Sequence, residues 1–182
     1  MRTWIADASV WTPERGAVSA EDGLGALSRF SRTCAAVVER VLIPDRDVLV
    51  ILGTSTLPTV SATDVARELG ARWPGSGLEF VVAGSKTLPL SGLDALASVG
   101  CGRTVLWAVV DLKPGAELAA VVRLSRAATN TRLEIARTDE LAPPAAEHLN
   151  SCAGLLSLVE TVDRGSVSIK VDSWSLAVTP EL

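Results

Sequence analysis

Short apolar runs alternate along this chain with segments in which apolar residues recur every three or four positions. The runs cover residues 48–52, 78–82 and 105–110, which is the usual length of a buried strand. The segments between them, residues 61–69 and 91–99, have the spacing of helices with one buried face. Because parallel strands need crossover connections, this alternation predicts an α/β fold with a mostly parallel sheet.

The first part of the chain fits the same pattern. Residues 3–12 are largely apolar and are followed by Pro13, which predicts a buried first strand. Residues 27–41 have helical spacing and end near Pro44, which predicts the first helix.

The second part predicts a different arrangement. Residues 119–124 and 133–136 predict neighbouring strands that give the sheet an antiparallel edge. If residues 145–162 form a helix, apolar or small side chains lie around nearly its whole circumference. This pattern predicts a buried helix near the C-terminus. Residues 166–170 and 173–178 predict a closing β-hairpin.

The composition limits how this fold can be closed. Hydrophobic residues make up 48% of the 182 residues and aromatic residues only 4%, so the core consists mainly of Val, Leu and Ala. So much apolar surface requires a sheet covered on both faces, closure by a partner, or both. The length suits one core, and we expect residues 1–182 to form a single domain.

Several classes of function are disfavoured by the same composition. A net charge of -4 without a basic stripe argues against nucleic-acid binding. The cysteines, Cys34, Cys101 and Cys152, are scattered and suit free thiols, and their spacing predicts neither a metal site nor any cofactor. No apolar run reaches about 18 residues, and the first residues lack the apolar core of a secretion signal, so we expect a cytoplasmic protein without membrane contact.

Two short stretches resemble the active-site turns of β-ketoacyl synthases. Residues 82–87, VAGSKT, are similar to the T-A-C-S-S-S turn of those enzymes, and Gly84 falls on the position of the catalytic cysteine. Residues 147–154, EHLNSCAG, are similar to their G-H-T-x-x-A-x-G turn. His148, the single histidine of the chain, precedes Gly154 by the spacing that the family uses for its second active-site histidine.

The order of the elements resembles the thiolase superfamily, in particular the β-ketoacyl synthases and their chain-length-factor relatives. The ending Trp11-Thr12-Pro13 of the first strand, residues 104–111 with 119–124, and residues 173–178 are similar to strands of that family. The resemblance implies a shortened thiolase-like fold. Condensing enzymes of the family have roughly twice this length, and the elements that supply their first catalytic histidine are missing between about Arg126 and Pro144.

The resemblance implies an accessory role, because decarboxylative condensation needs a thiolate that holds the acyl group. Gly84 has no side chain and cannot form that intermediate. We therefore expect a non-condensing subunit of bacterial fatty-acid or polyketide-type biosynthesis that pairs with a catalytic ketosynthase or an acyl carrier protein. Subunits of the relatives associate by extending the sheet across a two-fold axis, which here implies a dimer formed through residues 78–82.

Two alternatives remain open. The chain can instead be a small enzyme, a cyclase, dehydratase or isomerase, that acts on a carrier-bound acyl chain with His148 as acid or base and Asp111 or Ser85 as helper. Ser85 is also the one candidate for a substitute nucleophile in the turn, although its only possible imidazole base is His148. A generic α/β interaction module is the second alternative.

Overall fold

The computed structural model describes residues 3–12, 28–43, 47–55, 61–113, 116–127, 129–137, 154–156, 158–159, 167–171 and 173–180. Its elements along the chain are β1 (Thr3–Trp11), α1 (Arg29–Val38), β2 (Val48–Thr54), α2 (Ala62–Arg72), β3 (Gly77–Val82), the short 3-10 helix η3 (Gly84–Lys86), α3 (Thr87–Gly100), β4 (Thr104–Lys113), β5 (Ala116–Ser125), β6 (Thr131–Arg137), β7 (Val167–Val171) and β8 (Trp174–Pro180). In the described part of the chain, no helix combines the length and the apolar character that crossing a membrane requires.

The strands form one mixed sheet of eight strands in the order β3-β2-β4-β5-β1-β6-β8-β7. The pairs β2–β3 and β2–β4 are parallel, as the alternation of runs and helices predicts. All the other pairs are antiparallel. The α/β fold class is confirmed, and its antiparallel part is larger than the sequence suggested.

One prediction about strand neighbours is wrong. β5 and β6, which follow each other in the chain, are not paired, because β1 lies between them. β1 pairs along most of its length with β5, from Trp4↔Ser125 to Trp11↔Ala119, and only through Thr3 and Trp4 with β6. The N-terminal strand therefore joins the main sheet to the last three strands.

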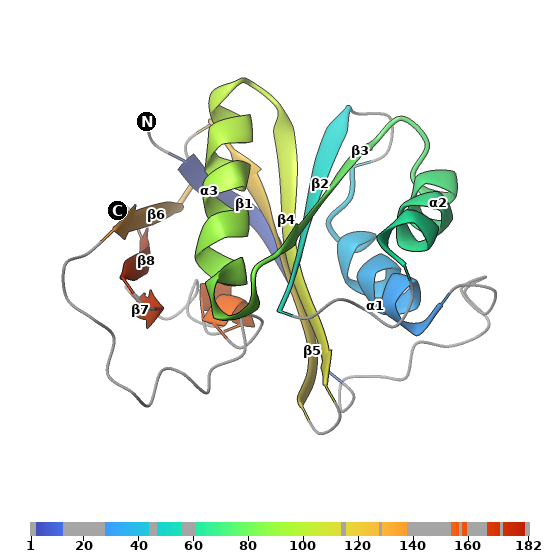
Figure 1. Ribbon diagram of the computed structural model, residues 1–182. Coiled ribbons are helices and arrows are strands. Elements are labelled where there is room, and N and C mark those ends of the chain that lie inside the picture. Colours follow the sequence, from blue (N-terminus) through green and yellow to red (C-terminus); the bar gives the residue numbers. More distant parts are fainter. Residues whose placement is uncertain are drawn as a thin grey trace.

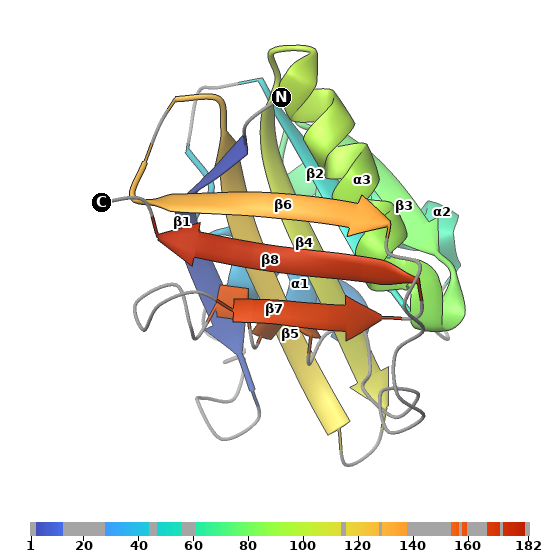
Figure 2. The ribbon, with the colours of Figure 1, turned by 90° about the vertical axis from the view of Figure 1, so that its left-hand side faces the viewer.

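Helices and the last three strands cover the two faces of the sheet. In Figure 1, α1 and α2 lie on one face and α3 lies on the other. Figure 2 shows β6, β8 and β7 running across the face that carries α3. Both faces are thus closed, which confirms the covered sheet that the apolar composition requires.

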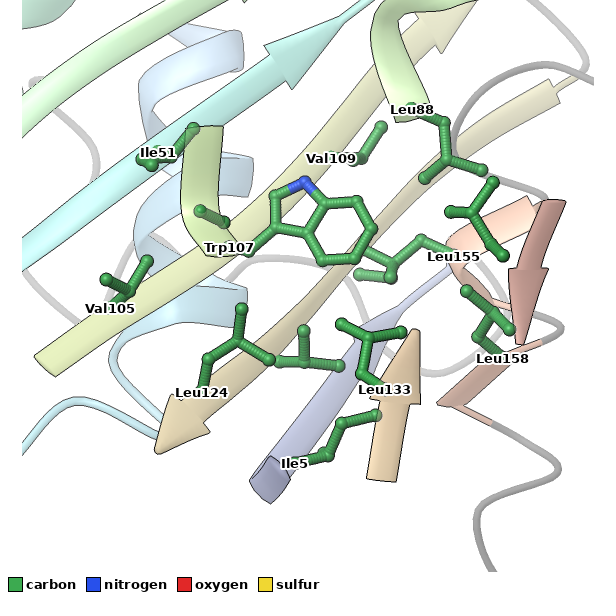
Figure 3. Packing of buried hydrophobic residues seen from close by; sticks show 14 of the residues in the cluster. Ile5, Ile51, Leu88, Val105, Trp107, Val109, Leu124, Leu133, Leu155 and Leu158 are labelled. Atoms are coloured by element: carbon green, nitrogen blue, oxygen red, sulfur yellow. The ribbon is translucent and has the colours of Figure 1, made fainter. Parts of the chain in front are cut away.

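The side chains of β2 show how the two faces are separated. Leu49 and Ile51 pack on the side of α3, and Val50 and Leu52, pointing the other way, pack on the side of α1 and α2. Trp107 of β4 lies in the middle of the α3 side and is completely buried (Figure 3). A continuous apolar run such as that of β2 is explained by this burial on both faces.

The helix boundaries agree with the sequence in part. Ser61 caps α2, with its Oγ accepting the backbone N–H of Asp64 at 3.1 Å, and the helix extends to Arg72, beyond the predicted residues 61–69. α3 begins at Thr87 rather than at Ser91. The closing hairpin is confirmed by β7 and β8.

The buried helix near the C-terminus is confirmed where the structure describes it. Residues 154–156 and 158–159 are helical, and Leu155 and Leu158 are buried in the core on the side of α3. The rest of the predicted helix over residues 145–162 lies outside the described residues.

Candidate functional site

Gly84 lies at the junction between a strand and a helix, where the resemblance to the condensing enzymes put it. β3 ends at Val82, and Gly84 opens η3, which leads directly into α3. The φ angle of Gly84 is 58°, in the left-handed region that residues with a side chain rarely adopt. The residue is exposed, and a Cβ added there would meet no heavy atom within 4 Å. The turn therefore has room for a side chain but carries none.

Thr87 fixes the backbone of this turn. Its buried Oγ1 accepts the backbone N–H of Ala83 and donates to the carbonyl oxygen of Thr54, both at 2.9 Å. One side chain thus connects the end of β2, the end of β3 and the first turn of α3. No local sequence pattern indicated Thr87, because the positions of its two partners are set by the packing of the strands.

The N-terminus of α3 has no side-chain cap. The first N–H groups of a helix have no partner within the helix and can donate to a carbonyl oxygen or an anion. In α3, however, the N–H of Thr87 already donates to the carbonyl oxygen of Gly84, and Pro89 has no N–H. Donors of this kind can hold a thioester oxygen, but without a nucleophile or a base they do not make a condensing enzyme.

Asp111 is a buried carboxylate at the same end of the sheet. Its Oδ1 accepts the backbone N–H of Ser55 at 3.1 Å and the Oγ–H of Ser55 at 2.6 Å. Its Oδ2 is also buried and has no hydrogen-bond partner among the described residues. Because Gly53 of β2 is in register with both Val81 and Val109, Asp111 and the turn lie two strands apart, roughly 10 Å.

Replacing Asp111 by Ala is expected to lower the free energy of unfolding by about 1–3 kcal/mol, because both donors of Ser55 lose their acceptor. Asp111→Asn keeps one oxygen as an acceptor and should lose less. Urea denaturation followed by circular dichroism measures both. An Ala variant as stable as the wild type would show that this carboxylate does not hold the end of β2.

The other predicted site residues are placed as follows. Ser85 is exposed in η3, and no described side chain lies within hydrogen-bond distance to act as its base. His148 lies outside the described residues, as does Cys152. Gly154, at the end of the second motif, packs against the start of α3, since a Cβ there would lie 2.5 Å from Cδ2 of Leu88. The structure thus brings the described end of the second motif to the helix that follows Gly84.

The two described cysteines do not replace the missing thiol. Cys34 is completely buried in α1, and burial raises the pKa of its thiol. Cys101 is exposed but follows the C-terminus of α3, about 21 Å along that helix from the turn. Among the described residues, no group of three or more His, Cys, Asp or Glu side chains could hold a metal ion.

Comparison with known proteins gives a result for the structure but not for the sequence. No family model and no curated protein matches the sequence. The structure of the ketosynthase ApeO in complex with its chain length factor ApeC from Xenorhabdus doucetiae matches with a TM-score of 0.64 at 14% identity, over 98% of this chain and 99% of that one.

Two further solved structures are similar over nearly the whole of both chains. ChlB3, described as an acyltransferase, has a TM-score of 0.64 at 12% identity and covers 99% of this chain and 98% of its own. The 3-oxoacyl-[acyl-carrier-protein] synthase III from Aquifex aeolicus VF5 has a TM-score of 0.58 at 10% identity, with coverage of 98% and 100%. The chain has the thiolase-like fold of these solved structures.

Proposed function

We propose that this protein is a non-condensing, ketosynthase-like accessory subunit of bacterial fatty-acid or polyketide-type biosynthesis. The observation that carries the proposal is Gly84, a residue without a side chain at the strand-to-helix turn of a ketosynthase-like fold. A condensing enzyme needs a nucleophile that forms an acyl intermediate. The degenerate turn therefore leaves the chemistry to another subunit.

The proposed partner is a catalytic ketosynthase-type subunit. The similarity to a structure in which a ketosynthase is bound to its chain length factor supports this pairing. β3 offers a surface for it, because it is the edge strand next to the Gly84 turn and its Val82 is 41% exposed. An unprotected edge strand readily pairs with a strand of another chain. A second copy of this chain could use the same edge, and an acyl carrier protein remains a further proposed partner.

Co-expression with a catalytic ketosynthase tests the proposal, and a ketosynthase gene found next to the gene of this chain would identify the one to use. We expect the two chains to elute together in gel filtration and to condense acyl substrates. Activity should disappear when the partner's catalytic cysteine is replaced by Ala. It should persist when Gly84→Ala is introduced here. Activity that survives loss of the partner's cysteine, or a chain that elutes as a monomer beside the partner, would contradict the proposal.

A second candidate function is supported by Oδ2 of Asp111, a buried oxygen to which no described residue donates a hydrogen bond. A small enzyme that acts on a carrier-bound acyl chain would use His148 as acid or base, with Asp111 or Ser85 as helper. The His148→Ala and Asp111→Asn variants test this candidate. If both variants form the same product as the wild type, the chain is not an enzyme of this kind. A pull-down that retains neither ketosynthase nor acyl carrier protein would favour a generic interaction module.

A cytoplasmic location of the protein stays a prediction.

A further inference from the structure

A second polar site lies at the opposite end of the sheet from Gly84. A pocket of about 510 Å³ opens between the turn that precedes β4, the end of β5 and the start of β1. In Figure 1 this is the upper end, where α3 passes into β4, whereas β3 reaches α3 at the lower end. The six residues of β3 span roughly 20 Å between the two ends. A small ligand bound in this pocket would not reach the Gly84 turn.

Three arginines line the pocket: Arg103, Arg123 and Arg126. Arg103 extends over the start of β3, where a Cβ added to Gly77 would lie 2.8 Å from its Nη2. Arg126 reaches towards the turn before β4, with its Nη1 at 3.8 Å from a Cβ added to Gly102. The guanidinium of Arg103 is thus turned towards β3, on the far side of β4 from β5 and β1. Arg123 and Arg126 supply the positive charge on the β5 side of the pocket, in a protein whose net charge is -4.

Only part of this positive charge is neutralised within the described structure. Nη2 of Arg123 lies 3.5 Å from a carboxylate oxygen of Asp7, and its buried Nε finds no hydrogen-bond partner in the described ranges of the chain. Among the described residues, neither Arg103 nor Arg126 forms an ion pair. Of the two arginines on the β5 side of the pocket, Arg126 thus has no carboxylate partner in the part of the chain that the structure describes.

The walls of the pocket are held in place by the surrounding backbone. Thr129 donates its Oγ1–H to the carbonyl oxygen of Ile5 at 2.7 Å, and Oγ of Ser125 accepts the N–H of Ala127 at 3.0 Å. The pairing of β1 with β5 is irregular between Ile5 and Asp7, and the residue skipped there, Ala6, lines the pocket. Bulges of this kind often lie beside functional sites.

Neutralisation of the C-terminal dipole of α3 does not account for these arginines. Cations near the end of a helix stabilise it, and α3 ends at Gly100, just before Arg103. The last carbonyl groups of α3, those of residues 97–99, however, already accept backbone N–H groups of Cys101, Gly102 and Arg103. The guanidinium donors are thus not used to cap the helix.

We propose that this pocket binds a small molecule that carries one or more phosphate groups. The planar donors of arginine match phosphate oxygens in pairs, and Arg123 with Arg126 exceeds what the single carboxylate of Asp7 requires. The volume lies within the range of about 300–1,000 Å³ for ligand pockets and leaves room for an organic group beside the phosphates. This inference does not rest on the proposed accessory function.

Isothermal titration of the full chain with pyrophosphate and with ADP tests the proposal, with sodium chloride at matched ionic strength as the reference. We expect saturable binding of at least one of the two probes. Arg126→Gln and Arg123→Gln should each weaken it roughly tenfold, because each removes a charged donor. Arg67→Gln is the matched control, since it removes the same charge from an exposed position on α2 that pairs with Asp64.

Two results would overturn the proposal. One is a titration in which neither pyrophosphate nor ADP gives a saturable heat of binding. The other is an equal loss of affinity in the Arg67→Gln control, which would show a general effect of charge. If Arg123→Gln fails to fold because its contact with Asp7 is lost, Arg126→Gln decides alone, since Arg126 is exposed and forms no ion pair with a described residue.

Discussion

Replacing Trp107 by Ala is expected to lower the free energy of unfolding by about 3–5 kcal/mol. Trp107 is completely buried between the sheet and α3, and its Nε1–H donates to Oγ of Ser91 at 2.8 Å. Figure 3 shows it at the centre of the cluster that also contains Leu88 and Leu155. The substitution opens a cavity where α3 meets the sheet. Urea denaturation measures the loss.

Trp107→Phe is the matched variant, because it keeps most of the ring volume and removes the hydrogen bond to Ser91. We expect it to lose less stability than the Ala variant. A loss below about 1 kcal/mol for Trp107→Ala would contradict the packing of α3 on this face, since truncation of a buried large side chain costs several times as much.

If the proposed complex with a catalytic subunit forms through β3, replacing Val82 by Lys is expected to weaken it roughly a hundredfold, about 2.7 kcal/mol. Val82 is the exposed apolar residue at the end of the edge strand β3. A partner strand that pairs there would bury the new ammonium group without a counter-charge, which is strongly unfavourable. Titration of the catalytic subunit with each variant measures the dissociation constant.

Ser168→Lys is the matched control for this experiment. Ser168 is exposed on β7, which forms the other edge of the same sheet. It receives the same charge on a strand to which the proposal assigns no partner. Equal weakening by both variants would show a general effect of charge, and an unchanged dissociation constant for Val82→Lys would exclude β3 as the interface.

Local patterns in the sequence predicted most of the elements but not all of their neighbours. The apolar runs of β2 and β4 are buried on both faces, so their composition alone identified them. The pairing of β5 with β1 rather than with β6 could not be predicted, because a strand pattern shows which face is buried and not which strand lies beside it. α3 begins four residues before the predicted helix over residues 91–99, and it includes Pro89, because proline is tolerated in the first turn of a helix.

The candidate sites show the same difference between a local pattern, which the sequence reveals, and a contact between distant residues, which it does not. Gly84 was located correctly at its junction, because a strand, a turn and a helix in succession form a local motif. The contact of Ser55 with Asp111 joins residues far apart in the chain, and the sequence showed Asp111 only as a polar residue after a strand. The arginine pocket is likewise assembled by β4, β5 and the segment after β5, so no local pattern indicated it.

Intact mass spectrometry after incubation with an acyl thioester donor tests most directly whether the turn at residues 82–87 lacks a nucleophile. The Cys101→Ser variant should be used, because the exposed thiol of Cys101 can react without any active site. The account predicts that no acyl group is found on residues 82–87. An acyl adduct that peptide mapping places on Ser85 or elsewhere in this turn would contradict it.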